Sequence, residues 1–418
     1  MGICELGPDE GLGERKATLR PKSARLGGVL AVGLALTLGL AACSDGGGTE
    51  ASPEAGSSSA AAGSTIKLGF MGDLTGANAG IVIPPRNGAK LVIDEYNKTN
   101  PAVKVEMVEY DSQADPSKAV ALAQQAIKTD KIVGLIGPAF SGESAQVAPV
   151  MEEAMIPSIS ASATNAALSA NGWKYWHRVL PSDSVQGPGI GNFMADGVGA
   201  KNAFVIDDKS EYGKPLADVV RTTLEGKGVK LTNDSLDPAE SDFSSVVNKV
   251  VAAKPDAIFF GGYYAAGGVL LKQLRDKGVT AKFLSGDGSL DKGLIDGAGA
   301  ANAEGALVGC PCYIATPDVT DAKVKAFADA YKAAYSADPA IYAAEGYDAA
   351  TVFIDAIKAG NTTADKINAF IGTVDFAGVS KQVKFEANGE VAAKDIYIYQ
   401  VKDGAIGLLG KAAEAKLG

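Results

Sequence analysis

Short apolar segments alternate with amphipathic segments along most of the chain, and this alternation sets the fold class. The first series predicts strands at 66–71, 103–109, 132–136 and 156–160, separated by helices at about 87–98, 116–129 and 143–153. The second series predicts strands at 203–207, 229–232, 257–261, 282–285 and 305–309, with helices at about 187–197, 214–226, 242–253 and 267–277. Strands that are apolar throughout are typical of parallel sheets covered by helices on both faces. A chain of 418 residues is long enough for two domains, so we expect an α/β protein of two similar lobes.

The last quarter of the chain departs from this pattern. Three further helices are predicted near 321–335, 345–359 and 363–371. Two apolar segments, 382–386 and 395–401, then flank the dipeptide Asn388-Gly389, which favours the type I′ turn of a hairpin. We therefore expect the chain to close with antiparallel strands rather than with another β/α unit.

The N-terminal segment has the features of an export signal. Basic residues precede an apolar, uncharged run at 26–42, which is slightly short for a bilayer span of about 20 residues. The run ends at Leu40-Ala41-Ala42-Cys43, which resembles the lipobox of bacterial lipoproteins. That resemblance implies a signal peptide over 1–42 and a diacylglycerol on the thiol of Cys43. The alternative is an uncleaved N-terminal membrane helix, and both place the rest of the chain outside the cytoplasm. The Gly, Ser and Ala residues of 43–64 predict a flexible tether.

Composition narrows the classes of function. The formal net charge is −10 at pH 7, which argues against a nucleic-acid partner. The chain has a single histidine and neither a Gly-x-Ser-x-Gly elbow nor a phosphate-binding glycine-rich loop, so we do not expect an enzyme.

The remaining cysteines suggest a disulfide rather than a metal site. Cys310 and Cys312 are separated by one proline, and an oxidising compartment favours a disulfide between them, although such a bridge is geometrically tight. A metal site needs more ligands, and His177 is far away in sequence, so we expect no metal or other cofactor.

Two loops of the first series are candidates for binding an anion. In open α/β sheets, ligands bind beyond the carboxyl ends of the strands. The loops 137–142 and 161–165 follow two predicted strands and are rich in small residues and hydroxyl groups, among them Ser141 and Thr164. Backbone N–H groups at helix starts, together with these hydroxyls, would suit a carboxylate. The alternative is that Ser141 and Thr164 only cap helices.

Three residues of the second series complement these loops. Tyr212, Tyr263 and Asp287 each follow a predicted strand. Tyrosine offers an apolar face with a polar tip, and Asp287 could pair with an ammonium group, although Asp-Gly is also common in turns. Hydroxyl groups facing an acid across a cleft would suit a zwitterion, namely an α-amino acid.

From about residue 66 to 401 the chain resembles the periplasmic Leu/Ile/Val-binding proteins, the type I solute-binding proteins of ABC importers. The segments that carry the resemblance stand in the family's order: Tyr110-Asp111-Ser112-Gln113-Ala114-Asp115-Pro116 with Ala119-Val120, Asp183-Ser184-Val185-Gln186-Gly187, Tyr212-Gly213, Asp242-Phe243-Ser244 and Gly261-Gly262-Tyr263.

The resemblance implies two Rossmann-like lobes joined by a three-strand hinge, with crossings near 182, 310 and 393. The cysteine pair then lies in a hinge strand, which a disulfide would stiffen. The implied lobes are 65–182 plus 312–392 for lobe 1 and 183–311 plus 393–418 for lobe 2.

The resemblance also implies roles for individual residues. Ser141 and Thr164 would hold the ligand carboxylate, while the backbone near Ser162 and the acid of Asp287 would hold the ammonium group. The other residues of the implied site are Ala139, Phe140, Tyr212, Tyr263 and Tyr342, of which Tyr212 and Tyr263 would close from the second lobe and Tyr342 would border the side-chain pocket.

The sequence differs from the family pattern at three places, and these differences leave open which ligand side chain is preferred. Family members often have glutamate at the position of Asp287. A tyrosine typical of the leucine-binding pattern is missing from the loop 77–81. Ala114 and Phe140 replace a disulfide found in one branch of the family, and Phe140 would place a ring beside the ligand side chain.

Taken together, these observations predict a monomeric, lipid-anchored binding protein on the extracytoplasmic face of the cell membrane. It would capture an amino acid, with a branched side chain favoured, and deliver it to an ABC permease. The alternatives are a ligand-sensing lobe for a receptor and a binding protein for another amino acid or a short amide.

Overall fold

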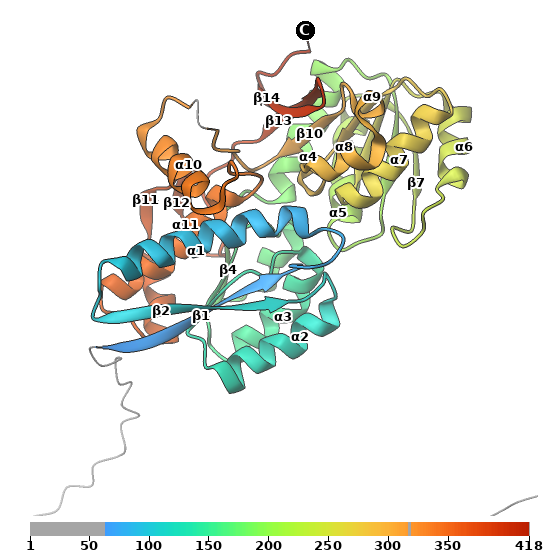
Figure 1. The fold of residues 1–418 in the computed structure, drawn as a ribbon. Helices are drawn as coiled ribbons and strands as arrows, with labels where there is room; N and C mark the ends of the chain where they lie inside the picture. Colours follow the sequence, from blue (N-terminus) through green and yellow to red (C-terminus); the bar gives the residue numbers. More distant parts are fainter. Residues whose placement is uncertain (1–62, 317–318, 418) are drawn as a thin grey trace, which may run out of the picture. The chain divides into compact units, whose positions relative to one another are not determined.

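The computed structural model describes residues 63–316 and 319–417 (Figure 1). The predicted signal peptide 1–42, the predicted lipid site Cys43 and nearly all of the predicted tether lie outside these residues. Ser64, at the end of the predicted tether, already belongs to the first strand. The described chain forms two α/β lobes, each built on its own sheet, which confirms the fold class predicted from the alternating pattern.

Five described strands form the first sheet, in the order β2-β1-β3-β4-β5 with all neighbours parallel. They are β1 (Ser64–Gly72), β2 (Val103–Asp111), β3 (Gly134–Ile136), β4 (Ser158–Ser160) and β5 (Trp176–Arg178). Figure 1 shows α1 (Ile83–Lys98) and α11 (Ala343–Lys358) on one side of the sheet, with α2 (Pro116–Gln125) and α3 (Ser141–Glu153) on the other. Successive side chains of a strand point to opposite faces, so Phe70 packs in the core with α1 and α11, whereas Met71 packs with α2 and α3.

Seven described strands form the second sheet, in the order β14-β13-β10-β9-β8-β6-β7. They are β6 (Asn202–Asp207), β7 (Lys230–Ser235), β8 (Ala257–Gly261), β9 (Lys282–Ser285), β10 (Leu307–Cys310), β13 (Tyr397–Lys402) and β14 (Ala405–Lys411). The strands from β10 to β7 are parallel, whereas β13 is antiparallel to both β10 and β14.

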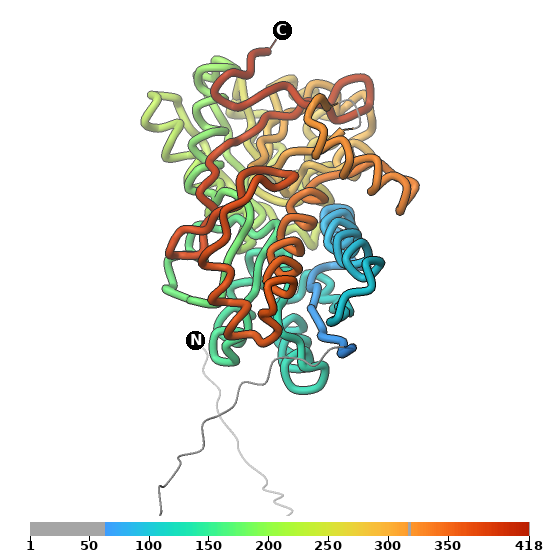
Figure 2. The backbone as a smooth tube through the Cα atoms, turned by 90° about the vertical axis from the view of Figure 1, so that its left-hand side faces the viewer, coloured from blue at the N-terminus to red at the C-terminus, as the bar shows by residue number. Residues whose placement is uncertain are grey.

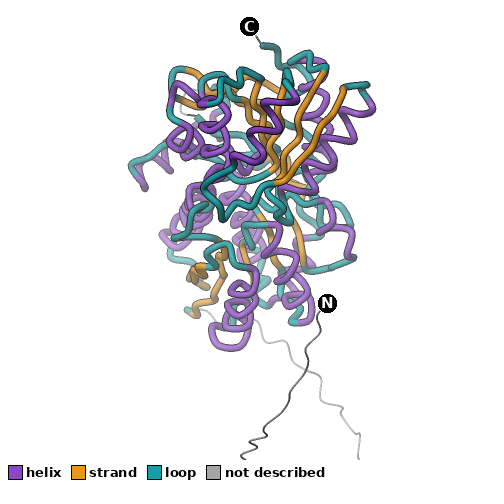
Figure 3. Tube along the Cα trace, turned by 90° about the vertical axis from the view of Figure 1, so that its right-hand side faces the viewer, coloured by secondary structure: helices purple, strands orange, loops and turns teal. Residues whose placement is uncertain are grey.

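Helices cover both faces of this second sheet (Figure 3). Val205 and Phe259 pack in the core with α4 (Asp183–Asn192) and α5 (Gly213–Gly226). Phe204 and Phe260 point to the opposite face and pack with α6 (Ser244–Ala253), α7 (Tyr264–Asp276) and α8 (Lys292–Ala298). The shorter helical segments are η1 (Ala79–Ile81), η2 (Ala126–Asp130), η3 (Ala166–Asn171), η4 (Phe193–Gly197), η5 (Asp287–Ser289) and α9 (Ala300–Ala303).

The chain passes between the two lobes three times, which places the hinge. The passages connect β5 to α4, β10 to α10 (Ala322–Tyr335), and β12 (Gln382–Lys384) to β13. They fall where the family resemblance implies them, near 182, 310 and 393. Figure 2 follows this path, in which α10 and α11 come after the second series in sequence but return to pack on α1 of the first lobe.

The predicted hairpin around Asn388-Gly389 is only partly correct. The turn forms, with Gly389 at φ +80° and a bridge between Phe385 and Val391. However, β12 pairs with β11 (Asp375–Ala377), and β13 belongs to the second sheet. The prediction failed because a turn signal specifies the local reversal but not the partner of each strand. The chain does end with antiparallel strands, since β13 pairs with β14.

Most helix boundaries lie within four residues of the predicted ones. Among the described strands and α-helices, the sequence did not predict β5, β11, β14, α8 and α9. It did predict α12 (Ala364–Ile371). Across residues 63–316 and 319–417, no helix is both long and apolar enough to span a bilayer.

Candidate ligand-binding cleft

A small cavity lies between loops of the two lobes. It is lined by Ile81, Val82, Ala139, Phe140, Ser141, Ser162 and Tyr342 together with Tyr212, Tyr263, Asp287 and Gly288. All the predicted ligand-binding residues except Thr164 therefore line this cavity. The two sets of loops follow strands of different sheets, as expected if ligands bind beyond the carboxyl ends of parallel strands.

Asp287 is the buried acid of the cavity. It is the first residue of η5, separated from the end of β9 by Gly286, and its carboxylate is almost fully shielded from solvent. Its Oδ1 accepts hydrogen bonds from Gln186 Nε2 and Tyr212 Oη, both at 2.6 Å, and its Oδ2 accepts one from Tyr342 Oη. A carboxylate has about four lone-pair sites, so Oδ2 can accept one more donor.

The protonation state of Asp287 reflects two opposing effects. Burial raises the pKa of its carboxyl group, while the hydrogen bonds from Tyr212, Tyr342 and Gln186 lower it. Burial also raises the pKa of Tyr212, Tyr263 and Tyr342 well above the usual value, so these phenols stay neutral donors. The site therefore combines one acid with a set of neutral hydroxyl groups.

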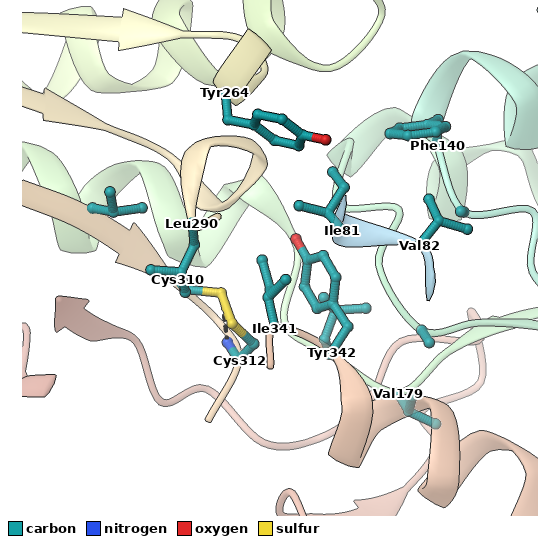
Figure 4. Packing of buried hydrophobic residues seen from close by; sticks show 14 of the residues in the cluster. Ile81, Val82, Phe140, Val179, Tyr264, Leu290, Cys310, Cys312, Ile341 and Tyr342 are labelled. Atoms are coloured by element: carbon teal, nitrogen blue, oxygen red, sulfur yellow. Dashed lines mark hydrogen bonds between the residues drawn. A yellow bond between two sulfur atoms is a disulfide. The ribbon is translucent and has the colours of Figure 1, made fainter. Parts of the chain in front are cut away.

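Tyr342 lines the cavity and also contacts its acid. It precedes α11 with φ +60°, a left-handed conformation that is uncommon for non-glycine residues. Its hydroxyl group bonds to Asp287, so the residue orients the acid as well as bordering the cavity. Figure 4 shows its ring beside Ile341 and near Ile81.

The first-lobe hydroxyls do not cap helices. Ser141 is the first residue of α3, where Phe140 is the N-cap, and Ser141 Oγ accepts a hydrogen bond from the backbone N–H of Asn165 at 3.2 Å. Thr164 precedes Asn165, whose side chain accepts from Ala167 N and caps η3. The capping alternative therefore does not describe either residue.

Ser162 and Thr164 contribute to the site in different ways. Ser162 Oγ donates to the carbonyl of Ala139 at 2.7 Å, which ties the two first-lobe loops together. Thr164 is not among the residues that line the cavity, and its buried Oγ1 has no hydrogen-bond partner within the described residues.

Aromatic contacts connect the two lobes around the cavity. The rings of Phe140 and Tyr263 meet edge to face with centroids 5.1 Å apart, and Tyr263 is 5.1 Å from Tyr212. Such pairs add about 0.5–1.5 kcal/mol to the burial of their area. Ile81 and Val82 complete the apolar part of the lining.

Sequence reasoning missed Ile81, Val82, Gly288 and Gln186. In the sequence, the loop 77–81 differs from the family pattern by its missing tyrosine, and in the structure its Ile81 supplies an apolar side chain to the cavity. Gln186 stands in the segment 183–187, which was assigned to the lobe crossing and not to the site.

The two hinge cysteines are joined by a disulfide and are both fully buried (Figure 4). The next residues are held by Tyr399 of β13, whose hydroxyl donates to Cys312 O at 3.1 Å and accepts from Ile314 N at 3.0 Å. In the part of the chain that the structure describes, no group of three or more His, Cys, Asp or Glu residues is placed to hold a metal ion.

Two α/β lobes with a triple crossing and a small polar cavity between them define a two-lobed solute-binding protein. The chain belongs to the periplasmic binding protein family, whose sequence model matches residues 65–405. This is a family of binding proteins and not of enzymes.

Two relatives are named for the amino acids that they bind. A leucine-, isoleucine-, valine-, threonine- and alanine-binding protein of Pseudomonas aeruginosa is 29% identical over 340 residues, which are 80% of this chain and 90% of that protein. The leucine-specific-binding protein of Salmonella typhimurium is 32% identical over 249 residues, or 59% of this chain and 67% of that protein.

Solved structures agree with this assignment. A leucine-binding protein of Thermotoga maritima has a TM-score of 0.76 and 27% identity, covering 83% of this chain and 98% of that one. A branched-chain amino acid transporter substrate-binding protein of Streptococcus pneumoniae, in complex with isoleucine, has a TM-score of 0.75 and 27% identity. The match covers 83% of this chain and 99% of that one.

Proposed function

We propose that this protein captures an L-amino acid, with a branched apolar side chain preferred, between its lobes and delivers it to an ABC permease. The observation that carries the proposal is the buried Asp287 carboxylate, which retains one free acceptor position in a cavity otherwise lined by hydroxyls and apolar side chains. The specificities of the Pseudomonas and Salmonella relatives support the choice of ligand class.

Each part of the ligand would meet matching chemistry. The ammonium group would donate to Asp287 Oδ2, and the carboxylate would accept from Ser141, Thr164 and the first N–H groups of α3, which have no intrahelical acceptor. The side chain would pack on Ile81, Val82 and Phe140. The charge pair gains strength as closure excludes water and lowers the local dielectric.

Lobe closure would convert binding into a signal for the permease. We propose lobe 1 as 65–182 plus 312–392 and lobe 2 as 183–311 plus 393–418. The ligand would favour the closed arrangement because it contacts both lobes only there.

We further propose that the mature protein is a monomer held at the membrane by a lipid on Cys43 after removal of residues 1–42. Two or more acyl chains give stable anchoring, since each buried CH₂ contributes about 0.8 kcal/mol. The segment 43–64 would let the lobes reach the permease.

Thermal unfolding against the twenty amino acids, urea and short amides tests the proposed ligand class. A ligand at about 100 times its Kd stabilises the folded state by about 2.7 kcal/mol. We expect L-leucine, L-isoleucine or L-valine to raise Tm most, and Asp287→Asn to abolish the shift. The matched control is Asp208→Asn, a buried carboxyl of the same lobe that does not line the cavity and accepts from Ser210. A larger shift with an amide, or an undiminished shift in Asp287→Asn, would overturn the proposal.

A further inference from the structure

Arg178 is a buried cation whose side chain reaches a loop of the candidate cleft. It is the last residue of β5, and its side chain is completely shielded from solvent. Its Nη1 donates to Ala163 O and to Asn165 O, both at 2.9 Å. One guanidinium nitrogen therefore holds two carbonyl groups of the loop 161–165, which lines the cavity through Ser162.

The guanidinium group of Arg178 is also held from two other directions. Its Nη2 forms a buried ion pair with Oε1 of Glu390, in the turn that precedes the third crossing between the lobes. The backbone N–H of Arg178 donates to Gly389 O of the same turn at 3.0 Å. The guanidinium carbon lies over the ring of Trp176, 4.9 Å from its centroid. These contacts fix the position from which Arg178 holds the loop.

Stability alone is a weak explanation for the buried pair of Arg178 and Glu390. Taking two charges out of water costs free energy that their mutual attraction often does not offset, so apolar side chains of similar volume are commonly as stable. A guanidinium group, however, presents its N–H donors in a rigid planar fork, which suits it to fix the directions of several acceptors at once. The arrangement therefore favours a positioning role.

The bonds from Arg178 also set the direction of a backbone donor. The carbonyl of Ala163 and the N–H of Thr164 belong to one planar trans peptide unit, so they point in opposite directions. Because Ala163 O faces Arg178, the Thr164 N–H is turned away from it. This N–H donates to no residue of 63–316 and 319–417, and the hydroxyl of the buried Thr164 is equally unpartnered there. Buried donors are rarely left unpaired, so this loop keeps two of them for an acceptor from outside the chain.

We infer that Arg178, held by Glu390, is the positioning residue for the carboxylate end of the ligand. It fixes the loop 161–165 so that the free donors of Thr164 meet the carboxylate. This inference deepens the proposed function and rests on it. Arg178 does not line the cavity, so it acts through the loop and not by touching the ligand. The preference for an amino acid over the corresponding amine therefore depends on Arg178.

A comparison of L-leucine with 3-methylbutylamine, which is leucine without its carboxyl group, tests this role. Equilibrium dialysis with radiolabelled leucine gives one Kd, and displacement by the amine gives the other. Arg178→Lys should raise the Kd of leucine by about tenfold or more, because a single ammonium group cannot hold Glu390 and both loop carbonyls. The Kd of the amine should stay within about twofold of the wild-type value, since it has no group that meets the loop. Glu390→Asp, which shortens the partner of Arg178, should change the ratio in the same direction and keeps the test available if Arg178→Lys does not fold.

The matched control is Arg275→Lys. Arg275 Nη1 also donates to two carbonyl groups, Val279 O at 2.6 Å and Ala281 O at 3.1 Å, but in the second lobe and away from the cavity lining. This variant should keep the wild-type ratio of the two Kd values. If Arg178→Lys and Glu390→Asp weaken leucine and the amine equally, or weaken neither, the inference is overturned and the proposed function stands. A wild type that does not bind any amino acid would overturn the proposed function itself.

Discussion

His177 shows how burial alone sets the charge of a side chain. It is the single histidine of the chain, it lies in β5, and its ring meets Phe385 edge to face at 5.2 Å. Burial lowers the pKa of its imidazole from 6.5 to about 4, partly offset by a backbone interaction with Ser158. The imidazole ring of His177 is therefore neutral in the folded state at neutral pH.

This lowered pKa predicts a pH dependence of stability with a definite sign. The unfolded chain binds the extra proton between about pH 6.5 and 4, so stability contributed by His177 is complete above pH 6.5 and is lost as pH falls. The loss is of the order of 3 kcal/mol at about 1.4 kcal/mol per pKa unit. One imidazole signal in the NMR spectrum reports the folded pKa directly. A midpoint near 6.5 in the folded protein would contradict the burial argument.

At the scale of elements, the start of α3 determines how the first lobe presents Phe140 and Ser141 to the cavity. Glu143, at the third helical position, accepts from the backbone N–H of Phe140 at 3.3 Å through Oε2 and from Ser112 Oγ through Oε1. A Glu at this position returning to the N-cap N–H is one half of a capping box. Burial raises the pKa of Glu143 to about 7 despite these bonds, with Asp73 and Asp111 adding to the rise.

We predict that Glu143 makes the protein less stable as pH rises from about 4.5 to about 7. The folded state holds the proton in this range while the unfolded state releases it, so ionisation costs stability, by roughly 3 kcal/mol at neutral pH. Glu143→Gln keeps an acceptor for Phe140 N–H and should lack this pH dependence. Urea unfolding of both proteins at pH 5 and pH 8 measures the difference, and parallel curves would contradict the assignment.

The disulfide between Cys310 and Cys312 is a second local feature of the elements, and it lies in the hinge. Because the loop it closes is so short, we expect its reduction to lower the free energy of unfolding by only about 2 kcal/mol or less. Its effect should be local, namely faster amide hydrogen exchange around 309–315, where Tyr399 also holds the chain. Mild reduction followed by exchange measurements tests this, with Tyr399→Phe as the comparison. Unchanged exchange would mean that the disulfide does not stiffen the hinge.

The elements also show how far the sequence alone predicts this fold and this cleft. Apolar strands such as β6 and β8 are recognisable because both faces are buried, and the loops after them could be found by the strand-end rule. Tyr212, Tyr263 and Asp287 were located in this way. The pairing of β12 and β13 was not predictable because it depends on tertiary partners. Nor were Ile81 and Gln186, since a lone apolar residue or amide carries no sequence signal for a cavity.

At the scale of the whole molecule, the closed arrangement depends on contacts between lobes that lie outside the cavity. The backbone N–H of Gly80 donates to Tyr264 Oη at 3.1 Å, and Asn165 Nδ2 donates to Glu211 O at 2.5 Å. Figure 4 shows the hydroxyl of Tyr264 directed from α7 toward the segment that contains Ile81. Neither Tyr264 nor Glu211 lines the cavity, so these bonds stabilise closure without touching a ligand.

Tyr264→Phe should therefore weaken ligand binding without changing the ligand contacts. A closed state that loses one hydrogen bond, worth about 1 kcal/mol, is less populated, and the apparent Kd rises severalfold. Because the ligand leaves from the open state, most of the change should appear as faster dissociation. The matched control is Tyr335→Phe. The hydroxyl of Tyr335 donates to Asn87 O at 2.9 Å within the first lobe, so its removal should leave the dissociation rate unchanged. Stopped-flow release of L-leucine separates the two variants, and equal rates would show that closure does not depend on the contact between Gly80 and Tyr264.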